Sequence, residues 1–399
     1  MLVGVVGKAN VGKSTFFKAL TLADVEIANY PFATIKPNHG IGFVRVDCVD
    51  KEFNRQCNPR EGFCTHNVRF VPVDLIDVAG LVPGAHEGKG MGNQFLNDLN
   101  QANALIHVID CSGSTNERGE SISPGSYDPA KDVKFLENEL DYWFLGILKK
   151  GWEKFARQVQ QEHQDIIKAL AKQLSGLGVS EDVSKATIDK VGLDKSAPAQ
   201  WSEKNLFKLA REFRQITKPM IIAANKIDVP QAYENYEKLK KEFPEHLIVP
   251  CSAESELALK EAAKHKMIDY LPGANNFSLV KDTTLSEQQK AALNFIKTNL
   301  LDKYQTTGVQ EVMDQAVFNL LKFIAIFPGG INKLEDQHGN VLPDCFLLPE
   351  KSTALDFAYK IHSDLGDSFI RAIDVKTKMT VGKEHLLKHR DVVEIISHK

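Results

Sequence analysis

Gly7-Lys8-Ala9-Asn10-Val11-Gly12-Lys13-Ser14 is the stretch that decides the fold of this chain of 399 residues. The apolar run from Met1 to Val6 precedes it, and a segment with helical character from Thr15 to Leu20 follows it. A strand, a glycine-containing loop and a helix N-terminus in this order place backbone amides around a phosphate group. The spacing G-x-x-x-x-G-K-S therefore predicts a phosphate-binding loop at the start of an α/β sheet.

The residue types in this loop suit the task. Gly12 lets the main chain approach a phosphate closely, Lys13 can reach the β- and γ-phosphates of a nucleotide, and the Ser14 hydroxyl can ligate Mg²⁺. The alternative, a structural turn that matches the motif by chance, is disfavoured by the flanking strand and helix. We expect the phosphate loop to consist of Lys8, Ala9, Asn10, Val11, Gly12, Lys13, Ser14 and Thr15.

The composition bounds the class of protein. Apolar residues make up 43% and charged residues 25% of the chain, which is typical of a globular protein. A formal net charge of −3 does not by itself indicate nucleic-acid binding, so any surface that binds nucleic acid must be confined to one part of the chain. No apolar run reaches the roughly 18 residues of a membrane-spanning helix. The length of 399 residues predicts two or three domains, and we expect a cytoplasmic protein that does not bind membranes.

The six cysteines lie at positions 48, 57, 64, 111, 251 and 345, and none forms a C-x-x-C pair. This pattern favours reduced thiols. Cys57, Cys64 and His66 are close in the sequence, but their spacing matches no common zinc pattern, so we do not expect a metal cluster there. The segment from Asp50 to His66 is expected to be an irregular polar insertion.

A second motif lies at the end of a strand. The β-rich run from Val68 to Ile76 ends in Asp77-Val-Ala-Gly80, a D-x-x-G pattern at the position where ligands of open α/β sheets gather. Asp77 would hold Mg²⁺, and the Gly80 amide would contact the γ-phosphate. Thr34 lies in an expected loop from Thr21 to Gly40, and we expect its hydroxyl to close on Mg²⁺ while a γ-phosphate is present.

A third motif predicts the choice of base. Asn225-Lys226-Ile-Asp228 follows a strand-like run. The Asp228 carboxylate can accept hydrogen bonds from guanine N1–H and the 2-amino group, which adenine does not offer in that arrangement. Lys226 would lay its methylenes along the base, and Asn225 would tie this turn to the phosphate loop. Ser252 and Ala253, after the next strand, complete the set, with the Ala253 amide expected to meet guanine O6.

The rest of the chain predicts helices followed by a mixed tail. Apolar residues recur with helical period between residues 128 and 216, where Asp128 is the expected N-cap and a short helix is expected to begin near Ser202. Ser286 opens a capping-box pattern, and Ser352 is expected to cap a helix over 354–365. Further strands are expected from Phe323, at 341–348 as a hairpin arm, and at 369–375 and 391–396.

Together these motifs resemble the P-loop GTPases of the Obg-like class, and specifically the YchF family. The phrases that carry the resemblance are Tyr30-Pro-Phe-Ala-Thr34, Asp77-Val-Ala-Gly-Leu-Val-Pro-Gly-Ala-His-Glu-Gly and Gly92-Asn-Gln-Phe-Leu96. The resemblance covers essentially the whole chain. It implies an α/β fold, with a Ras-like mixed sheet, a helical insertion and a C-terminal ubiquitin-like β-grasp (TGS) domain. The expected segments are a GTPase domain at 1–127 and 217–275, a helical insertion at 128–216, a helical connector at 276–322 and the TGS domain at 323–399.

The resemblance also implies a monomeric GTP-binding protein that hydrolyses GTP and is linked to ribosomes. Ribosome or RNA contacts would come from the helical regions and from the TGS domain, where the stretch from Arg371 to Arg390 holds six basic residues against two acidic ones. A packed helical subdomain and a solvated basic face are equally compatible with these features. Many YchF proteins have an altered base motif and prefer ATP. The intact motif here favours GTP, with ATP as the alternative.

One catalytic element of many related GTPases is missing. Their glutamine after the D-x-x-G glycine orients the attacking water, and Leu81 stands at that position. We therefore expect slow basal hydrolysis, which a partner, a dimer or a monovalent cation would accelerate. Asn10 resembles the asparagine that binds K⁺ in potassium-activated GTPases, although it could instead be a loop-stabilising amide. The catalytic groups that remain are Lys13, Thr34 and Gly80.

Overall fold

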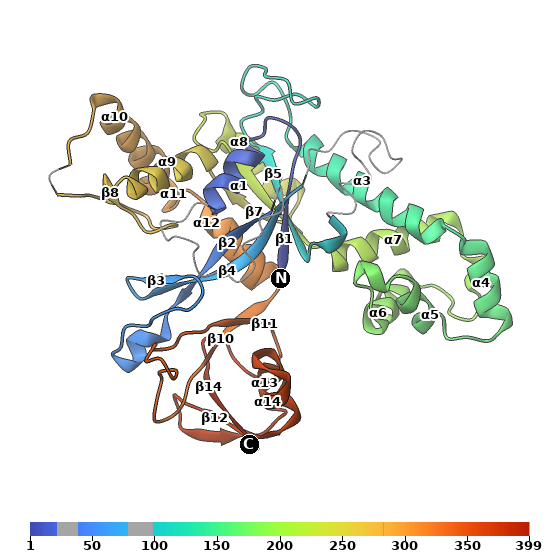
Figure 1. Cartoon of the computed structure of the whole chain (residues 1–399). Helices are drawn as coiled ribbons and strands as arrows, with labels where there is room; N and C mark the ends of the chain where they lie inside the picture. The colour runs from blue at the N-terminus through green and yellow to red at the C-terminus, as the bar shows by residue number, and fades with distance from the viewer. Residues whose placement is uncertain (22–38, 79–98, 282, 399) are drawn as a thin grey trace. The chain divides into compact units, whose positions relative to one another are not determined.

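A computed structural model describes residues 1–21, 39–78, 99–281 and 283–398 (Figure 1). The chain divides into two compact units: Met1–Phe17 with Leu75–Ser255, and Lys18–Asp74 with Glu256–Lys399. None of the described helices is long and apolar enough to cross a membrane. The segment boundaries expected from the sequence stay a prediction.

The first unit is built on the part of a mixed sheet that has the order β4-β1-β5-β6-β7, to which β4 contributes its carboxyl-terminal end. The strands are β1 (Leu2–Val6), β4 (Val68–Asp77), β5 (Ala104–Asp110), β6 (Met220–Asn225) and β7 (Leu247–Pro250). β5 runs parallel to both β1 and β6, and β6 runs parallel to β7. All residues of β5 and β6 are buried, as in parallel strands covered on both faces. The carboxyl ends of these strands meet at one edge of the sheet.

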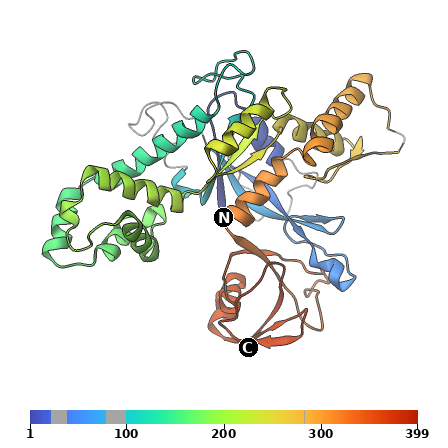
Figure 2. The same ribbon diagram turned by 180° about the vertical axis from the view of Figure 1, so that it is seen from behind.

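The helices of the first unit that lie between residues 128 and 216 confirm the helical period read from the sequence there. The helices of this unit are α1 (Lys13–Thr21), whose end belongs to the second unit, α3 (Ala130–Lys149), α4 (Trp152–Gln161), α5 (Ile166–Gln173), α6 (Glu181–Val191), α7 (Glu203–Thr217), α8 (Ala232–Glu242) and α9 (Ala253–Lys264), most of which lies in the second unit. Figures 1 and 2 show α3 and α7 side by side. Ser202 caps α7 as expected, but α7 is a helix of 15 residues rather than a short one.

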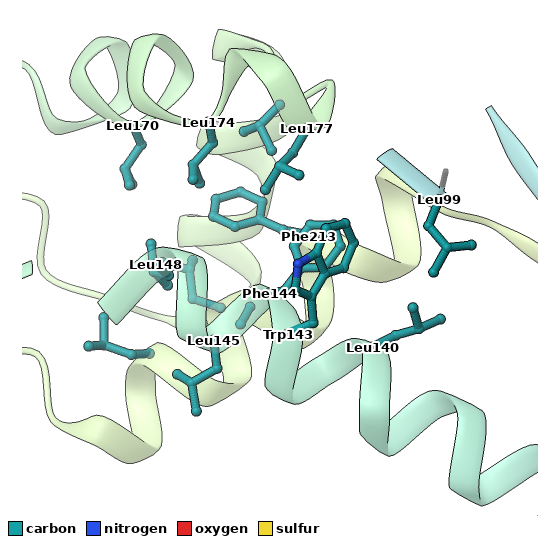
Figure 3. Close-up of a cluster of buried hydrophobic side chains, with 14 of the residues drawn as sticks. Leu99, Leu140, Trp143, Phe144, Leu145, Leu148, Leu170, Leu174, Leu177 and Phe213 are labelled. Atoms are coloured by element: carbon teal, nitrogen blue, oxygen red, sulfur yellow. The ribbon is translucent and has the colours of Figure 1, made fainter. Parts of the chain in front are cut away.

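The helical insertion has its own apolar core. Figure 3 shows Phe144 of α3 and Phe213 of α7 facing Leu170 and Leu174, and all four side chains are buried. The helix α3 begins at Ala130, and Pro129 is its N-cap residue. Asp128 therefore lies one residue before the N-cap, although its carboxylate still accepts a hydrogen bond from the Ala130 amide at 3.1 Å.

The second unit contains the remaining elements. Its first part holds β2 (His39–Asp47), β3 (Phe63–Thr65), β8 (Ile268–Asp269), β9 (Ser278–Leu279), α10 (Glu287–Ile296), α11 (Asp302–Tyr304) and α12 (Val309–Asp314). Ser286 and Gln289 form the expected capping box on α10. The segment from Asp50 to His66 is less irregular than expected, because it contains most of a 3-10 turn, Val49–Phe53, and the strand β3.

The C-terminal part of this unit is a five-stranded mixed sheet with the order β11-β10-β14-β12-β13. Its elements are β10 (Phe323–Pro328), β11 (Phe346–Pro349), α13 (Ala354–Ile361), α14 (Ser363–Asp367), β12 (Phe369–Asp374), β13 (Met379–Val381) and β14 (Val392–Ser397). The central pair, β10 and β14, is parallel, and the other pairs are antiparallel. Figures 1 and 2 show α13 and α14 against one face of this sheet, the arrangement of a β-grasp fold.

The expected cap of the helix after β11 is wrong by one residue. Thr353, not Ser352, is the N-cap of α13 and forms a capping box with Asp356. The Ser352 hydroxyl instead donates to the Pro349 carbonyl oxygen at 2.7 Å.

Candidate nucleotide-binding site

The phosphate loop leaves the carboxyl end of β1 and enters α1. A Cβ atom at Gly7 would come within 2.5 Å of the Val108 carbonyl oxygen in β5, so this position needs glycine. Gly12 has a φ of 88°, and a Cβ there would collide with the side-chain amide of Asn225. The Gly12 carbonyl accepts the first helical hydrogen bond from the Phe16 amide at 2.8 Å. The first backbone amides of α1, which have no partner within the helix, therefore lie in the phosphate loop, where they can bind an anion.

Asn225 joins three parts of the site. Its side chain is buried at the end of β6. Nδ2 donates to the Val11 carbonyl oxygen at 2.8 Å, and Oδ1 accepts from the Ala253 amide at 2.9 Å. One amide group thus links the phosphate loop, the end of β6 and the start of α9.

Lys226 adds a second link to the phosphate loop. Its backbone lies in the left-handed region with a φ of 62°. Its Nζ donates to the Asn10 carbonyl oxygen at 3.1 Å and forms an ion pair with Asp110 Oδ2 at 2.9 Å. Lys226 is half-buried.

Asp110 was not among the residues singled out from the sequence. It ends β5, is buried, and accepts hydrogen bonds from the hydroxyls of Ser112, Ser114 and Thr115. Burial raises the pKa of Asp110, but the hydrogen bonds from Ser112 and Lys226 outweigh that effect and hold the pKa below its usual value. An acid at the carboxyl end of a parallel strand, followed at once by hydroxyl residues, was the signal that could have indicated it.

Lys8 has a side chain that points away from the phosphate position. Its Nζ forms an ion pair with Asp132 at 2.8 Å, donates to the Thr115 carbonyl oxygen at 3.1 Å and lies 3.9 Å from the centre of the Tyr127 ring. Only the main-chain amide of Lys8 is thus left for a phosphate. The side chain instead anchors the loop to the start of α3 and to the segment after β5.

The segment after β5 also contacts the tip of the phosphate loop. Asn10 has a φ of 59°, and its Nδ2 donates to the Gly119 carbonyl oxygen at 2.8 Å. A Cβ at Gly119 would lie only 2.7 Å from the Cβ of Ala9, so the two segments are in close contact. The nitrogen of the Asn10 amide therefore stabilises the loop, as one of the two interpretations of this residue expected.

Lys13 and Asp77 come together at the carboxyl-terminal edge of the sheet. Lys13 Nζ forms an ion pair with Asp77 Oδ1, and both side chains are largely buried. Ser14, at the start of α1, is exposed, and Thr15 is half-buried. A hydroxyl and a carboxylate are oxygen ligands of the kind Mg²⁺ prefers, so the donor set fits that ion. Thr34, Gly80 and Leu81 lie outside the described residues.

The expected base contacts lie in two neighbouring turns. Asp228 is half-buried in the turn after β6, which is held by a hydrogen bond of 3.1 Å from the Ile227 amide to the Cys251 carbonyl oxygen. The Ser252 hydroxyl accepts from the Ser255 amide at 3.4 Å at the start of α9. Because the Ala253 amide already donates to Asn225, a bond to guanine O6 would have to share or replace that contact. The guanine contacts stay a prediction.

Three family models match the chain in order. A "50S ribosome-binding GTPase" model matches residues 2–139, an "Obg-like GTPase YGR210-like, G4 motif-containing domain" model matches residues 223–329, and a "TGS domain" model matches residues 337–397. The first contains the phosphate loop and Asp77, and the second contains Asn225 and Ala253. The first two family models therefore cover the two groups of residues that the structure brings together in the site.

Relatives match all or most of the chain. The "Uncharacterized GTP-binding protein MJ1332" of Methanocaldococcus jannaschii is 51% identical over 397 residues, which are 99% of each chain. The "Ribosome-binding ATPase YchF" of Bacillus subtilis is 30% identical over 323 residues, 78% of this chain and 80% of that protein.

Solved structures agree with these relatives. A GTP binding protein from Pyrococcus horikoshii has a TM-score of 0.80 at 38% identity, with 100% of each chain covered. The YchF GTPase of Schizosaccharomyces pombe, at 19% identity and a TM-score of 0.61 over 99% of this chain and 97% of that one, has the same fold. The chain belongs to the YchF family of Obg-like P-loop GTPases with a C-terminal TGS domain.

Proposed function

We propose that this protein binds GTP and GDP with Mg²⁺, hydrolyses GTP slowly and acts as a nucleotide-gated switch on ribosomes. The observation that carries the proposal is the fastening of the Asn225–Asp228 turn to the phosphate loop, through the carbonyl oxygens of Val11 and Asn10. These bonds fix the spacing between the position for the phosphates and the Asp228 carboxylate. A guanine nucleotide would span the two.

The same geometry supports a mechanism in which the protein mainly orients and neutralises the phosphates. The amides of residues 8–15 would receive the β-phosphate, and the Lys13 ammonium would exchange its Asp77 partner for phosphate oxygens. Ser14, Thr34 and Asp77 are the residues that would hold Mg²⁺, which when bound neutralises charge on the β- and γ-phosphates. Released from Lys13, the Asp77 carboxylate becomes available as a ligand.

Slow turnover follows from Leu81, which cannot orient water. GTPases that have the glutamine already hydrolyse GTP at only about 10⁻⁴ to 10⁻³ per second, and an added cationic group can be worth about 10³ to 10⁵. We propose that an activator completes the site. K⁺ is one candidate. It would bind the side-chain oxygen of Asn10, whereas the hydrogen bond to the Gly119 carbonyl oxygen uses the side-chain nitrogen.

The alternative substrate is ATP. It is favoured by the names of bacterial relatives, such as the ribosome-binding ATPase of Bacillus subtilis. The intact Asn225-Lys226-Ile-Asp228 motif and the name of the 51% identical relative, a GTP-binding protein, favour GTP instead. The ribosome link rests on the names of those bacterial relatives and on the basic stretch from Arg371 to Arg390. A ribosome- or RNA-binding module with incidental turnover is the second candidate.

Phosphate release from GTP tests the enzymatic part. The wild type is expected to turn over GTP slowly, and Lys13→Met is expected to lower the rate at least about tenfold, because the transition state loses a charge-assisted contact. Lys18→Met is the matched control, since Lys18 lies five residues further along α1 with its side chain 60% exposed. Equal rates for Lys13→Met and the wild type would contradict the mechanism.

Co-sedimentation with ribosomes tests the switch. The protein is expected to pellet with ribosomes to different extents when bound to a non-hydrolysable GTP analogue and to GDP. Equal pelleting in both states would favour the binding module over the switch.

A further inference from the structure

Three cysteines and an aspartate meet inside the second unit. Cys48 directly follows β2, Asp50 lies in the 3-10 turn Val49–Phe53, Cys57 lies in the loop after that turn, and Cys64 belongs to β3. One ligand atom from each of the four residues can be chosen so that all lie within 4.8 Å of one another. We infer that these four residues form a structural zinc site that is independent of the nucleotide site.

The distances fit ligands that share one ion. The sulfur atoms of Cys48 and Cys57 are 3.5 Å apart, and Cys64 Sγ lies 3.8 Å from Asp50 Oδ2. Zinc with Zn–S bonds of about 2.3 Å in a tetrahedral site separates its sulfur ligands by about 3.8 Å. A disulfide would bring two sulfurs to about 2.05 Å. The cluster therefore has the dimensions of a coordination shell.

Burial argues for a cation at this position. Asp50 has 0% of its surface exposed, and Cys48 and Cys57 have only 2% and 3%. The Asp50 carboxylate accepts from the Cys57 amide at 3.1 Å and from Asn67 Nδ2 at 3.2 Å, but it has no ion-pair partner among the residues the structure describes. A buried carboxylate without a compensating positive charge is costly, and a bound divalent ion supplies that charge.

Arg69 provides further electrostatic support. Three thiolates and a carboxylate around Zn²⁺ leave a net negative charge, and the buried Arg69 guanidinium lies with Nη1 at 3.7 Å from Cys57 Sγ. The guanidinium is held in place, because Nη1 and Nη2 also donate to the carbonyl oxygens of Leu342 and Pro343 at 3.0 and 2.8 Å. The guanidinium thus offsets part of the charge of a thiolate-rich zinc centre.

The donor set selects both the metal and its task. Thiolates favour zinc over Mg²⁺ or Ca²⁺, and four protein ligands leave no open position, which is typical of structural zinc. The ion would fix the loop 54–62, whose Asn58 and Arg60 amides donate to the carbonyl oxygens of Val341 and Pro343 at 2.9 and 2.8 Å in the same unit. We therefore assign it the task of holding this loop against residues 341–343.

The sequence did not indicate this set. Spacing drew attention to Cys57, Cys64 and His66, but His66 is exposed in the turn between β3 and β4 and lies near Asp269 instead. The ligands that spacing missed are Cys48 and Asp50, which the end of β2 brings beside the β3 hairpin. The Cys48 amide is tied to that hairpin by a bond of 2.8 Å to the Asn67 carbonyl oxygen.

The test measures metal bound to the full-length reduced protein. After incubation with zinc and removal of the excess, the wild type is expected to retain about one zinc ion per chain, as measured by inductively coupled plasma mass spectrometry. Cys57→Ser is expected to lower the retained zinc at least about tenfold, because a thiolate ligand is lost. Cys345→Ser is the matched control, since Cys345 is a free cysteine of the same unit outside the cluster, and it is expected to retain zinc like the wild type.

Cobalt substitution keeps the inference testable if Cys57→Ser fails to fold. Reduced wild-type protein titrated with Co²⁺ is expected to show thiolate-to-cobalt charge-transfer absorption and the intense visible bands of tetrahedral cobalt, both abolished by added zinc. Equal zinc retention by folded Cys57→Ser and wild type, or absence of these bands from the reduced wild type, would overturn the inference.

Discussion

Replacing Asn225 with alanine removes the one side chain that joins the phosphate loop to the base-reading turns. The substitution deletes the hydrogen bonds to the Val11 carbonyl oxygen, of 2.8 Å, and from the Ala253 amide, of 2.9 Å, at a buried position. Each such bond contributes about 0.5–1.5 kcal/mol net, so the arrangement that holds a nucleotide should lose about 1–3 kcal/mol. The expected loss of GDP affinity is about 5- to 150-fold.

Calorimetric titration with GDP and Mg²⁺ measures that loss, and urea unfolding checks that the variant is folded. Asn235→Ala is the matched control: it lies on α8, and its side chain donates a single bond of 2.9 Å to the Cys111 carbonyl oxygen, away from the phosphate loop. Its GDP affinity should stay within about threefold of the wild type. A folded Asn225→Ala protein that binds GDP within about twofold of the wild type would refute the assignment of Asn225 as the link between the two ends of the site.

Three further outcomes are expected. GTP turnover should be faster in K⁺ than in Na⁺, and Asn10→Ala should remove that difference; identical rates of the wild type in the two salts would exclude the cation. Burial lowers the pKa of His107 from 6.5 to about 3, so on acidification the unfolded chain takes up this proton first. The unfolding free energy of the wild type therefore falls as the pH drops below 6.5. His107→Gln lacks this titrating group, so between pH 6.5 and 4.5 its unfolding free energy should fall by about 2 kcal/mol less than that of the wild type, as measured in urea titrations. Parallel loss in the two proteins would show that His107 does not titrate in this way. Arg214→Met should lower the unfolding free energy by about 1.5–3 kcal/mol, because Asp141 and Glu137 lose their 2.8 and 3.3 Å partner. The loss is limited because Arg211 and His246 still contact these carboxylates at 3.6 and 3.2 Å. A loss below about 1 kcal/mol would mean that the buried triad is nearly neutral.

Motifs at strand ends were predictable because their signals are local. The glycine spacing before Lys13 and the apolar strands around it are readable over about ten residues, and parallel strands bring their carboxyl ends to one edge of the sheet. The same rule brings Asp77 to the phosphate loop, although the ion pair that it forms with Lys13 was not predicted. The helical period over 128–216 likewise predicted the core that includes Phe144 and Leu170.

Contacts between distant segments were not predictable in this way. The ion pairs of Lys8 with Asp132 and of Lys226 with Asp110 depend on how loops fold back after their strands, and no spacing indicates that. The choice between two adjacent hydroxyl residues as a helix cap depends on backbone angles, which place Thr353 in the extended region. The same limit concealed the cysteine cluster.

We propose that the site reads guanine through Asp228. Calorimetric titration of the wild type with GDP and with ADP tests it most directly, and Asp228→Asn is the companion variant. GDP should bind at least about 10²-fold more tightly than ADP, because a site built around a hydrogen-bonding acceptor rejects a base that cannot donate to it, and Asp228→Asn should lose most of that preference. ADP binding as tight as GDP binding in the wild type would contradict the account.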